Sequence, residues 1–440
     1  MDHNPIYNAR EQGTPKMLIL GVQHLFAMFG ATILVPAITG LSVSATLLFA
    51  GIGTLLFHFI SKMKVPAFLG SSFAFIGGYM SIKELGMTQG LSAEMALNYA
   101  CIGVAAASLV YFVMAALLRT FGTEKVMRYF PPVVTGPMVI AIGLTLSGSA
   151  ITNCQSSWLL AITAIVVVIV SSVWGKGMIK IIPILLGVIS SYALAAVMGD
   201  VDFSKLSEAA WIGMPVESGR TVFAVMSDLD SQILIASIIA IVPIAFATIM
   251  EHIGDMCAIQ STVNRNFIKD PGLHRTLTGD GLATLIASLF GAPANTTYGE
   301  NTGVLNLTKV FDPLVIRLAA VFAIVLSFCP KFACLIGLMP AATIGGVSLI
   351  LYGMISAVGV RNLVEQSVDF SSSRNVFVAA LILVIAIGVK YGANDAIAIG
   401  SVNFSGLALA AIVGIVLNAI LPEKLGMKVK SFDGKKKHEK

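Results

Sequence analysis

Long apolar runs separated by short polar segments dominate the chain. A helix that spans a bilayer needs about 20 mostly apolar residues, and the pattern predicts spanning segments at residues 17–38, 44–61, 68–84, 96–118, 132–150, 157–174, 179–199, 232–257, 277–292, 295–311, 314–330, 335–358, 375–391 and 402–421. The third and tenth of these fourteen segments are short and interrupted. The pattern therefore predicts an all-α polytopic membrane protein with 14 transmembrane segments, two of them irregular.

The interruption in the tenth segment is a polar stretch between two strongly apolar runs, Leu282 to Phe290 and Leu314 to Phe328. It extends from Pro293 to Gly303 and contains Gly299 and the carboxylate of Glu300. Proline and glycine disfavour a regular helix here. Unwound backbone at membrane depth is tolerated only where protein buries it or where it lines a cavity, and an ionisable residue there indicates a functional site. The alternative is a polar loop at the membrane interface.

A second copy of this pattern lies in the first half of the chain. Gln23-His24 precedes Pro66-Ala67 by 43 residues, and Glu251-His252 precedes Pro293-Ala294 by 42 residues. Two homologous halves of seven segments each must have opposite orientations, because seven is odd. Paired interrupted segments in inverted halves point to a transport site near the membrane midplane. Chance matching of short apolar segments is the alternative.

Composition agrees with a membrane protein. Hydrophobic residues make up 56% of the chain and charged residues 12%, whereas about a quarter of the residues in a soluble protein are charged. The net charge of +5 does not indicate nucleic-acid binding, because seven basic residues crowd into the tail after Pro422. The five cysteines lie in or beside apolar runs without a CxxC motif, so we expect no metal site and no cofactor.

Lysine and arginine are distributed unevenly between the two sides of the predicted membrane. The even-numbered loops contain fourteen of them and the odd-numbered loops only five. Basic residues are enriched in cytoplasmic loops. We therefore expect a multi-pass protein of the cell membrane, in contact with its lipid, with both termini in the cytoplasm.

The candidate site combines carboxylates with hydrogen-bond donors. Glu251 and Glu300 would repel each other in one cavity, so one of them should readily take up a proton. Asp255 lies one helical turn after Glu251 and on the same face; it is an equally good candidate for a structural ion pair. Carboxylates accept hydrogen bonds from N–H groups, while free backbone N–H groups at Phe73 and Gly299 would bind carbonyl oxygens.

A flat ligand with alternating N–H and C=O groups fits these donors and acceptors. Phe73 or Tyr298 would provide an aromatic wall for it, and a nucleobase has these properties. We expect Asp255, together with His24, Ser72 and Asn301, to take part in proton coupling or to support the residues that contact the ligand.

Four segments carry a family resemblance. The segment Glu300–Lys309, ENTGVLNLTK, resembles the signature of the nucleobase:cation symporter-2 family, also called the nucleobase–ascorbate transporter family. The segments at residues 23–36, 70–75 and 270–274 are similar to the bacterial uracil permease branch of that family. The likeness extends from about residue 15 to residue 425.

The resemblance implies an architecture and roles for individual residues. It implies two inverted 7-segment repeats, short strands at the starts of segments 3 and 10, and a frequently dimeric assembly, so a homodimer is one expected state. The core domain would comprise residues 17–118 and 232–330, and the gate domain residues 132–199 and 335–421. Glu251 and Glu300 would accept the N–H groups of the base, the Phe73 and Gly299 backbones would bind its carbonyls, and Tyr352 would contact it through water.

One position departs from the pattern of the uracil permease branch. Asp255 stands where such permeases carry a histidine, and an acid at this position also occurs in purine-transporting relatives. Glu300 favours a pyrimidine, because the xanthine and urate branch usually has glutamine there. The sequence thus predicts proton-coupled import of a nucleobase, uracil first, with a xanthine-type purine permease as the alternative.

Other functional classes fit the sequence less well. An inorganic-anion transporter of similar fold should present positive charge to its ligand, whereas the midplane candidates here are acids. A channel is a further alternative, but paired broken helices with coupled acids favour alternating access. GxSxG, HExxH and Walker-type motifs are absent from the sequence, so we do not expect an enzyme.

Overall fold

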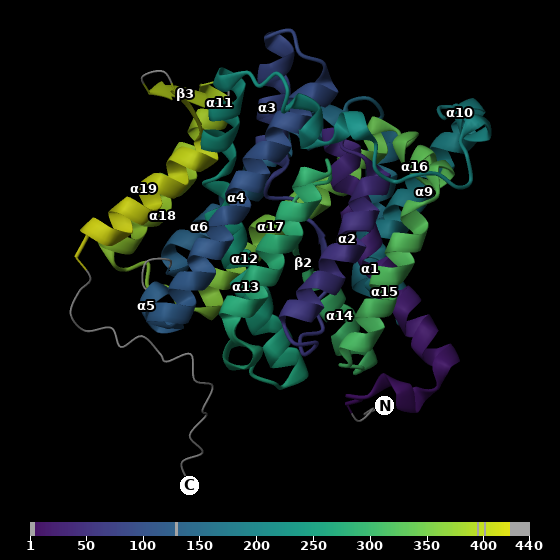
Figure 1. Cartoon of the computed structure of the whole chain (residues 1–440), viewed down its shortest axis with the longest axis horizontal. Helices are drawn as coiled ribbons and strands as arrows, with labels where there is room; N and C mark the ends of the chain where they lie inside the picture. The colour runs from purple at the N-terminus through teal and green to yellow at the C-terminus, as the bar shows by residue number, and fades with distance from the viewer. Residues whose placement is uncertain (1–4, 128–130, 394–395, 400–401, 423–440) are drawn as a thin grey trace.

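The computed structural model describes residues 5–127, 131–393, 396–399 and 402–422 (Figure 1). Within these residues the first half contains seven segments: α1 (Thr14–Thr39), α2 (Val43–Ile60), β1 with α3 (Leu69–Ser71 and Ile76–Thr88), α4 (Ala93–Phe121), α6 (Pro132–Cys154), α7 (Trp158–Trp174) and α9 (Pro183–Met198). The second half contains seven more: α11 with α12 (Ser231–Ile241 and Ile244–Val263), α13 (Leu273–Leu289), β2 with α14 (Asn295–Thr297 and Gly299–Thr308), α15 (Pro313–Ser327), α17 (Ala341–Glu365), α18 (Ser373–Gly392) and α19 (Gly406–Ile420).

Shorter elements connect these segments. They are η1 (Ala9–Gln12), α5 (Thr123–Met127), α8 (Met178–Ile181), α10 (Ser204–Glu208), η2 (Ser218–Arg220), η3 (Val222–Val225), the π-helical turn η4 (Ile268–Gly272), α16 (Pro330–Gly337), β3 (Ala396–Ile399) and β4 (Val402–Ser405). The predicted all-α polytopic class with fourteen segments and short strands at segments 3 and 10 is confirmed. Among the described helices, seven are long and apolar enough to cross a membrane, with α11 and α12 counted as one.

Helix boundaries follow local capping residues. The Ser42 hydroxyl accepts a hydrogen bond from the Ala45 N–H at the start of α2, and the Asp230 carboxylate accepts from the Gln232 and Ile233 N–H groups at the start of α11. Such side chains satisfy donors that have no partner inside the helix. α1 ends at Thr39, and the positive φ of 89° at the next residue, Gly40, suits the left-handed conformation that closes many helices.

Two of the predicted segment boundaries are wrong. Residues 335–358 were expected to form one span, but the structure ends α16 at Gly337 and begins α17 at Ala341. Pro340 causes this break, since its ring restricts the residue before it to extended backbone. α16 bends by 86° from α15. The last predicted span, 402–421, begins with strand β4, and its helix starts only at Gly406.

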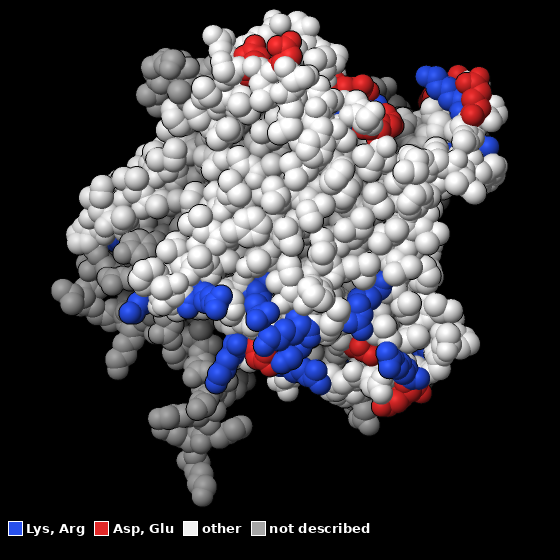
Figure 2. Space-filling view, in the orientation of Figure 1, with Lys and Arg blue, Asp and Glu red and all other residues white. Residues whose placement is uncertain are grey.

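Contacts between loops show which segment ends lie together. At one end, the Lys64 ammonium pairs with the Asp270 carboxylate, and the Ile6 N–H donates to the Lys309 carbonyl over 2.8 Å. Figure 2 shows Lys and Arg gathered along the lower part of the molecule, below a wide band of uncharged residues. We call this the basic end.

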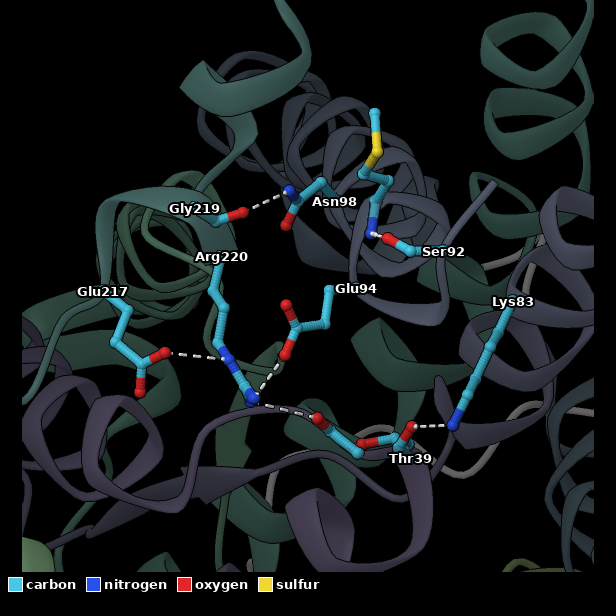
Figure 3. Close-up of polar contacts among 10 residues, drawn as sticks. Thr39, Lys83, Ser92, Glu94, Asn98, Glu217, Gly219 and Arg220 are labelled. Atoms are coloured by element: carbon cyan, nitrogen blue, oxygen red, sulfur yellow. Dashed lines mark hydrogen bonds and ion pairs between the residues drawn. The ribbon is translucent and has the colours of Figure 1, made fainter. Parts of the chain in front are cut away.

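The opposite end is held together by Arg220, in the loop that joins the two halves (Figure 3). Its guanidinium contacts the carboxylates of Glu94 at 2.5 Å and Glu217 at 3.1 Å. The neighbouring Gly219 carbonyl accepts a hydrogen bond of 2.9 Å from the Asn98 side chain. The loop is thus fastened to the start of α4.

The long segments form two packing groups. In the first, which we call the core group, α13 packs against α2 and α4, α15 against α1 and α2, and α11 against α4. In the second, the gate group, α17 packs against α6 and α7, α18 against α6 and α19, and α7 against α9. The two groups meet where α1, α3 and α12 face α6, α9, α17 and α19.

Candidate functional site

A pair of short strands lies at the centre of the candidate site. β1 pairs antiparallel with β2, with Gly70 opposite Thr296. Two further backbone bonds extend the ladder: the Ser72 N–H donates to the Ala294 carbonyl over 2.8 Å, and the Tyr298 N–H donates to the Phe68 carbonyl over 3.0 Å. The pairing joins the first half of the chain to the second.

Threonines on the flanking helices form hydrogen bonds with backbone N–H and C=O groups of the strands that are not paired between β1 and β2. The Thr54 hydroxyl on α2 accepts from the Leu69 N–H over 2.9 Å and lies 3.2 Å from its carbonyl. The Thr284 hydroxyl on α13 donates to the Asn295 carbonyl over 3.0 Å. Buried backbone groups need such partners, which explains how extended backbone is stable inside the helical protein.

Each strand is followed by a short helix, after residues 72–75 in the first half and after Tyr298 in the second. α3 begins at Ile76 and α14 at Gly299, and neither N-terminus has a side-chain cap. The first-turn N–H groups of a helix have no partner within the helix, and the helix dipole makes this end positive. Because the strands are antiparallel, the two helices follow the strand pair at its opposite ends.

Tyr298 lies beneath β1. Its ring is 3% exposed, and its hydroxyl donates to the Ser71 carbonyl over 2.9 Å and contacts the Thr32 hydroxyl at 3.3 Å. A Cβ on Gly70 would lie only 2.4 Å from the Tyr298 ring. In this structure the predicted wall residue therefore anchors the strand, and only glycine fits opposite it.

Helix α12 brings two acids to the second strand. Glu251 and Asp255 are half-buried and lie one turn apart on one face of the helix. The Thr297 hydroxyl donates to the Asp255 carboxylate over 2.6 Å, and α12 packs against both β2 and α14. Glu300 is the second residue of α14, but its side chain lies outside the described part of the structure.

Asn301 connects α14 to α1. Its amide nitrogen lies 3.1 Å from His24 Nδ1 and 3.1 Å from the His24 carbonyl. Both residues are fully buried. Among the described residues, no hydrogen-bond partner is found for His24 Nε2, Asn301 Oδ1 or the buried Ser72 hydroxyl. Buried polar atoms without protein partners usually bind water or a ligand.

Two aromatic residues lie where the packing groups meet. Phe73, between β1 and α3, is half-buried and packs against the large apolar cluster of the core group. It also packs against a cluster formed largely by α1, α9 and α17. Tyr352 on α17 is 2% exposed and belongs to the same large cluster as the core-group residues. The structure thus brings one predicted gate-side residue to the core group.

The sequence analysis assigned no role to several polar residues near these elements. Asp280 on α13 and His252 on α12 form a fully buried pair, with 2.9 Å between His252 Nδ1 and the Asp280 carboxylate. An acid within an apolar span was the available signal for Asp280. Thr297 and Thr32 gave no such signal, because hydroxyl residues are common in membrane helices. In the described residues, no group of three or more His, Cys, Asp or Glu side chains could hold a metal.

Comparison with known proteins identifies the family. The model of a permease family matches residues 15–394, which is most of the chain. This chain belongs to the nucleobase:cation symporter-2 permeases. This permease is 39% identical over 428 residues to the uracil permease of Bacillus subtilis, covering 94% of each chain. It is 41% identical over 430 residues to the uracil permease of Bacillus caldolyticus, covering 96% of this chain and 95% of the other.

A solved structure shares the fold of this permease. The murine solute carrier 26 family member A9, an anion transporter in the inward-facing state, aligns with a TM-score of 0.65 at 12% identity. The alignment covers 92% of this permease and 67% of the other chain. At this identity the likeness concerns the fold alone, and it agrees with two inverted repeats.

Proposed function

We propose that this permease imports uracil together with a proton. The two relatives described above are uracil permeases. The observation that carries the proposal is the antiparallel strand pair, which is followed by two helix N-termini without side-chain caps and lies beside the acids of α12. Carboxylates accept N–H groups, and helix N-termini donate to carbonyls. Uracil presents both kinds of group on one flat ring.

In the proposed complex the base lies between α3, α12 and α14. Glu251 and Glu300 accept its N–H groups, and the backbone N–H groups of Phe73 and Gly299 donate to its carbonyls. The Phe73 ring packs against the face of the base, and Tyr352 contacts it through water. Tyr298 supports this arrangement from below, since its hydroxyl is bonded to β1.

The acids also provide the proposed coupling. Two carboxylates that share a buried site repel each other, and uptake of one proton relieves the repulsion. Asp255 holds the Thr297 hydroxyl and so fixes the strand next to Gly299. His24, Ser72 and Asn301 support the site from α1, β1 and α14, where their unpartnered buried atoms can hold water.

Alternating access would come from motion of the core group against the gate group. Two small cavities lie between the groups, of about 20 Å³ and about 10 Å³. The first is lined by residues of α3 and α11 on one side and of α6, α18 and α19 on the other. A boundary between two separately packed groups is where inverted-repeat transporters move one bundle against the other. The core domain (17–118 and 232–330) and gate domain (132–199 and 335–421) are proposed as the moving units.

The membrane orientation is part of the proposal. Lys and Arg gather at one end of the molecule (Figure 2), and basic loops favour the cytoplasmic side. The N-terminal segment pairs with the loop after α14 at this basic end. We therefore place both termini in the cytoplasm and the protein in the cell membrane. A homodimer stays a prediction.

Uptake of labelled substrate tests the function. In cells that lack their own permeases, this protein should take up labelled uracil, and excess unlabelled xanthine should not compete. Preferential uptake of xanthine would instead support the purine alternative raised by Asp255. Uptake should fall when external pH rises or when a protonophore is added. Sodium-dependent uptake that is indifferent to both treatments would contradict proton coupling.

A further inference from the structure

Tyr79 connects the two halves of the site in a way that mirrors Tyr298. Tyr79 lies in the first turn of α3 and is fully buried. Its hydroxyl accepts a hydrogen bond of 2.9 Å from the Ala294 N–H, just before β2. In the other direction, the Tyr298 hydroxyl donates to the Ser71 carbonyl at the end of β1 over 2.9 Å. Each tyrosine thus holds the strand of the opposite half.

The backbone of Ala294 is held on both sides. Its carbonyl accepts from the Ser72 N–H over 2.8 Å, and its N–H donates to Tyr79. Pro293, the preceding residue, has no N–H to offer. These two bonds therefore fix the position at which the chain enters β2, and β2 leads to Gly299. Without the Tyr79 hydroxyl, the Ala294 N–H would lose the partner that the structure gives it.

We propose that Tyr79 is a positioning residue that sets the place of the Gly299 N–H relative to the Phe73 N–H. This inference rests on the proposed function, because these two N–H groups are the proposed donors to the carbonyls of uracil. Tyr79 touches the strand and not the base. Tyr298 is its counterpart and sets the place of the Phe73 N–H through Ser71.

The test compares Tyr79→Phe with a matched control, Tyr99→Phe. Tyr99 is 2% exposed, and its hydroxyl accepts a hydrogen bond of 2.7 Å from the Asp230 N–H in the loop between the halves. Both substitutions remove a buried hydroxyl that accepts a backbone N–H. Binding of uracil, 2-thiouracil and 4-thiouracil is measured on the purified full-length proteins, since sulfur in place of a carbonyl oxygen is a weaker acceptor.

Tyr79→Phe should weaken uracil binding about tenfold, which corresponds to the binding free energy of about one hydrogen bond. Tyr99→Phe should leave uracil binding unchanged. For the thio-analogue whose sulfur replaces the oxygen bound at Gly299, Tyr79→Phe and the wild type should bind within about twofold of each other. Tyr298→Phe should show the same pattern with the other analogue. This variant keeps the test decisive if Tyr79→Phe does not fold.

Two results would overturn the positioning role. One is an equal loss of affinity for uracil and both thio-analogues, which indicates a general structural effect. The other is unchanged uracil binding in Tyr79→Phe and Tyr298→Phe. Failure of the proposed function looks different, because the wild-type protein would then bind none of the three pyrimidines.

Discussion

The first interrupted segment, β1 with α3, and the second, β2 with α14, have the same backbone plan but different side chains. Each is a three-residue strand followed by a helix without a side-chain cap. The first provides Phe73 and Ser72, an aromatic ring and a hydroxyl. The second carries Glu300 and Asn301, and its strand contacts Asp255 on α12.

The helices that flank the two interrupted segments also share a backbone plan but differ in their side chains. α1 carries Gln23 at the position where α12 carries Glu251, and each is followed by a buried histidine. The inverted repeat therefore supplies a symmetric frame of backbone donors, while the acids are concentrated in the second half. We infer that both halves position the ligand but that only the second carries the charge needed for coupling.

Neutralising the acids should have the largest effect. Glu251→Gln or Glu300→Gln should reduce uracil uptake at least about 100-fold, since each removes a charged acceptor from the buried site. Gln23→Ala, at the equivalent position of the first half, should change uptake by less than about tenfold. Uptake of labelled uracil at equal surface expression measures this. Unchanged uptake in both glutamine variants would refute the assignment of the acids.

Crowding the first strand should have the next largest effect. Gly70→Ala places a Cβ 2.4 Å from the Tyr298 ring and 2.8 Å from the Thr32 hydroxyl, so it should destabilise the protein by about 1–3 kcal/mol. The control is Gly303→Ala in α14, where a Cβ would meet no atom within 4 Å. Thermal unfolding in detergent compares them. Equal unfolding midpoints would contradict the tight packing of β1 on Tyr298.

Loosening the second strand should have a smaller effect. Thr297→Val removes the 2.6 Å hydrogen bond to Asp255 and should raise the KM for uracil about fivefold without loss of expression. Thr278→Val on α13 is the matched control, because it removes a hydroxyl that, among the described residues, bonds only the helix carbonyl of His274. If both variants raise KM equally, Asp255 has no special role at the strand.

A surface contact between the halves should matter least. Lys64, before β1, pairs with Asp270, before α13, and the hydrogen bond from Lys64 lowers the pKa of the Asp270 carboxyl. A lowered carboxyl pKa stabilises the fold above the ordinary value of about 3.9 and loses this effect as pH falls. Both groups are exposed, so Asp270→Asn should lower the unfolding midpoint by at most about 1 °C at pH 7. A difference that persists undiminished at pH 3 would contradict this interpretation.

Much of the fold could be predicted because membrane helices leave a strong apolar signal. The interrupted segments were recognisable from Pro293, Gly299 and the repeat of the proline-alanine pairs. The break between α16 and α17 was missed, since residues 335–358 contain no charged residue and Pro340 marks the turn.

The cross-connections within the site could not be read from the sequence. Tyr79 and Ala294 are 215 residues apart, and nothing in one chain shows which hydroxyl meets which backbone group. Tyr298 was expected to provide an aromatic wall for the ligand, and nothing in the sequence shows that its hydroxyl donates to β1. Such pairings depend on how the two halves pack against each other, and the hydrophobic periodicity within each half does not show this packing.

An experimental structure with bound uracil tests the central claim most directly. The claim is that the two acids, one on α12 and one on α14, face a single ligand between the two helix N-termini. We predict that the base lies between α3 and α14, with its N–H groups on Glu251 and Glu300 and its carbonyls at Phe73 and Gly299. A base bound elsewhere, or either carboxylate turned toward lipid, would contradict the account.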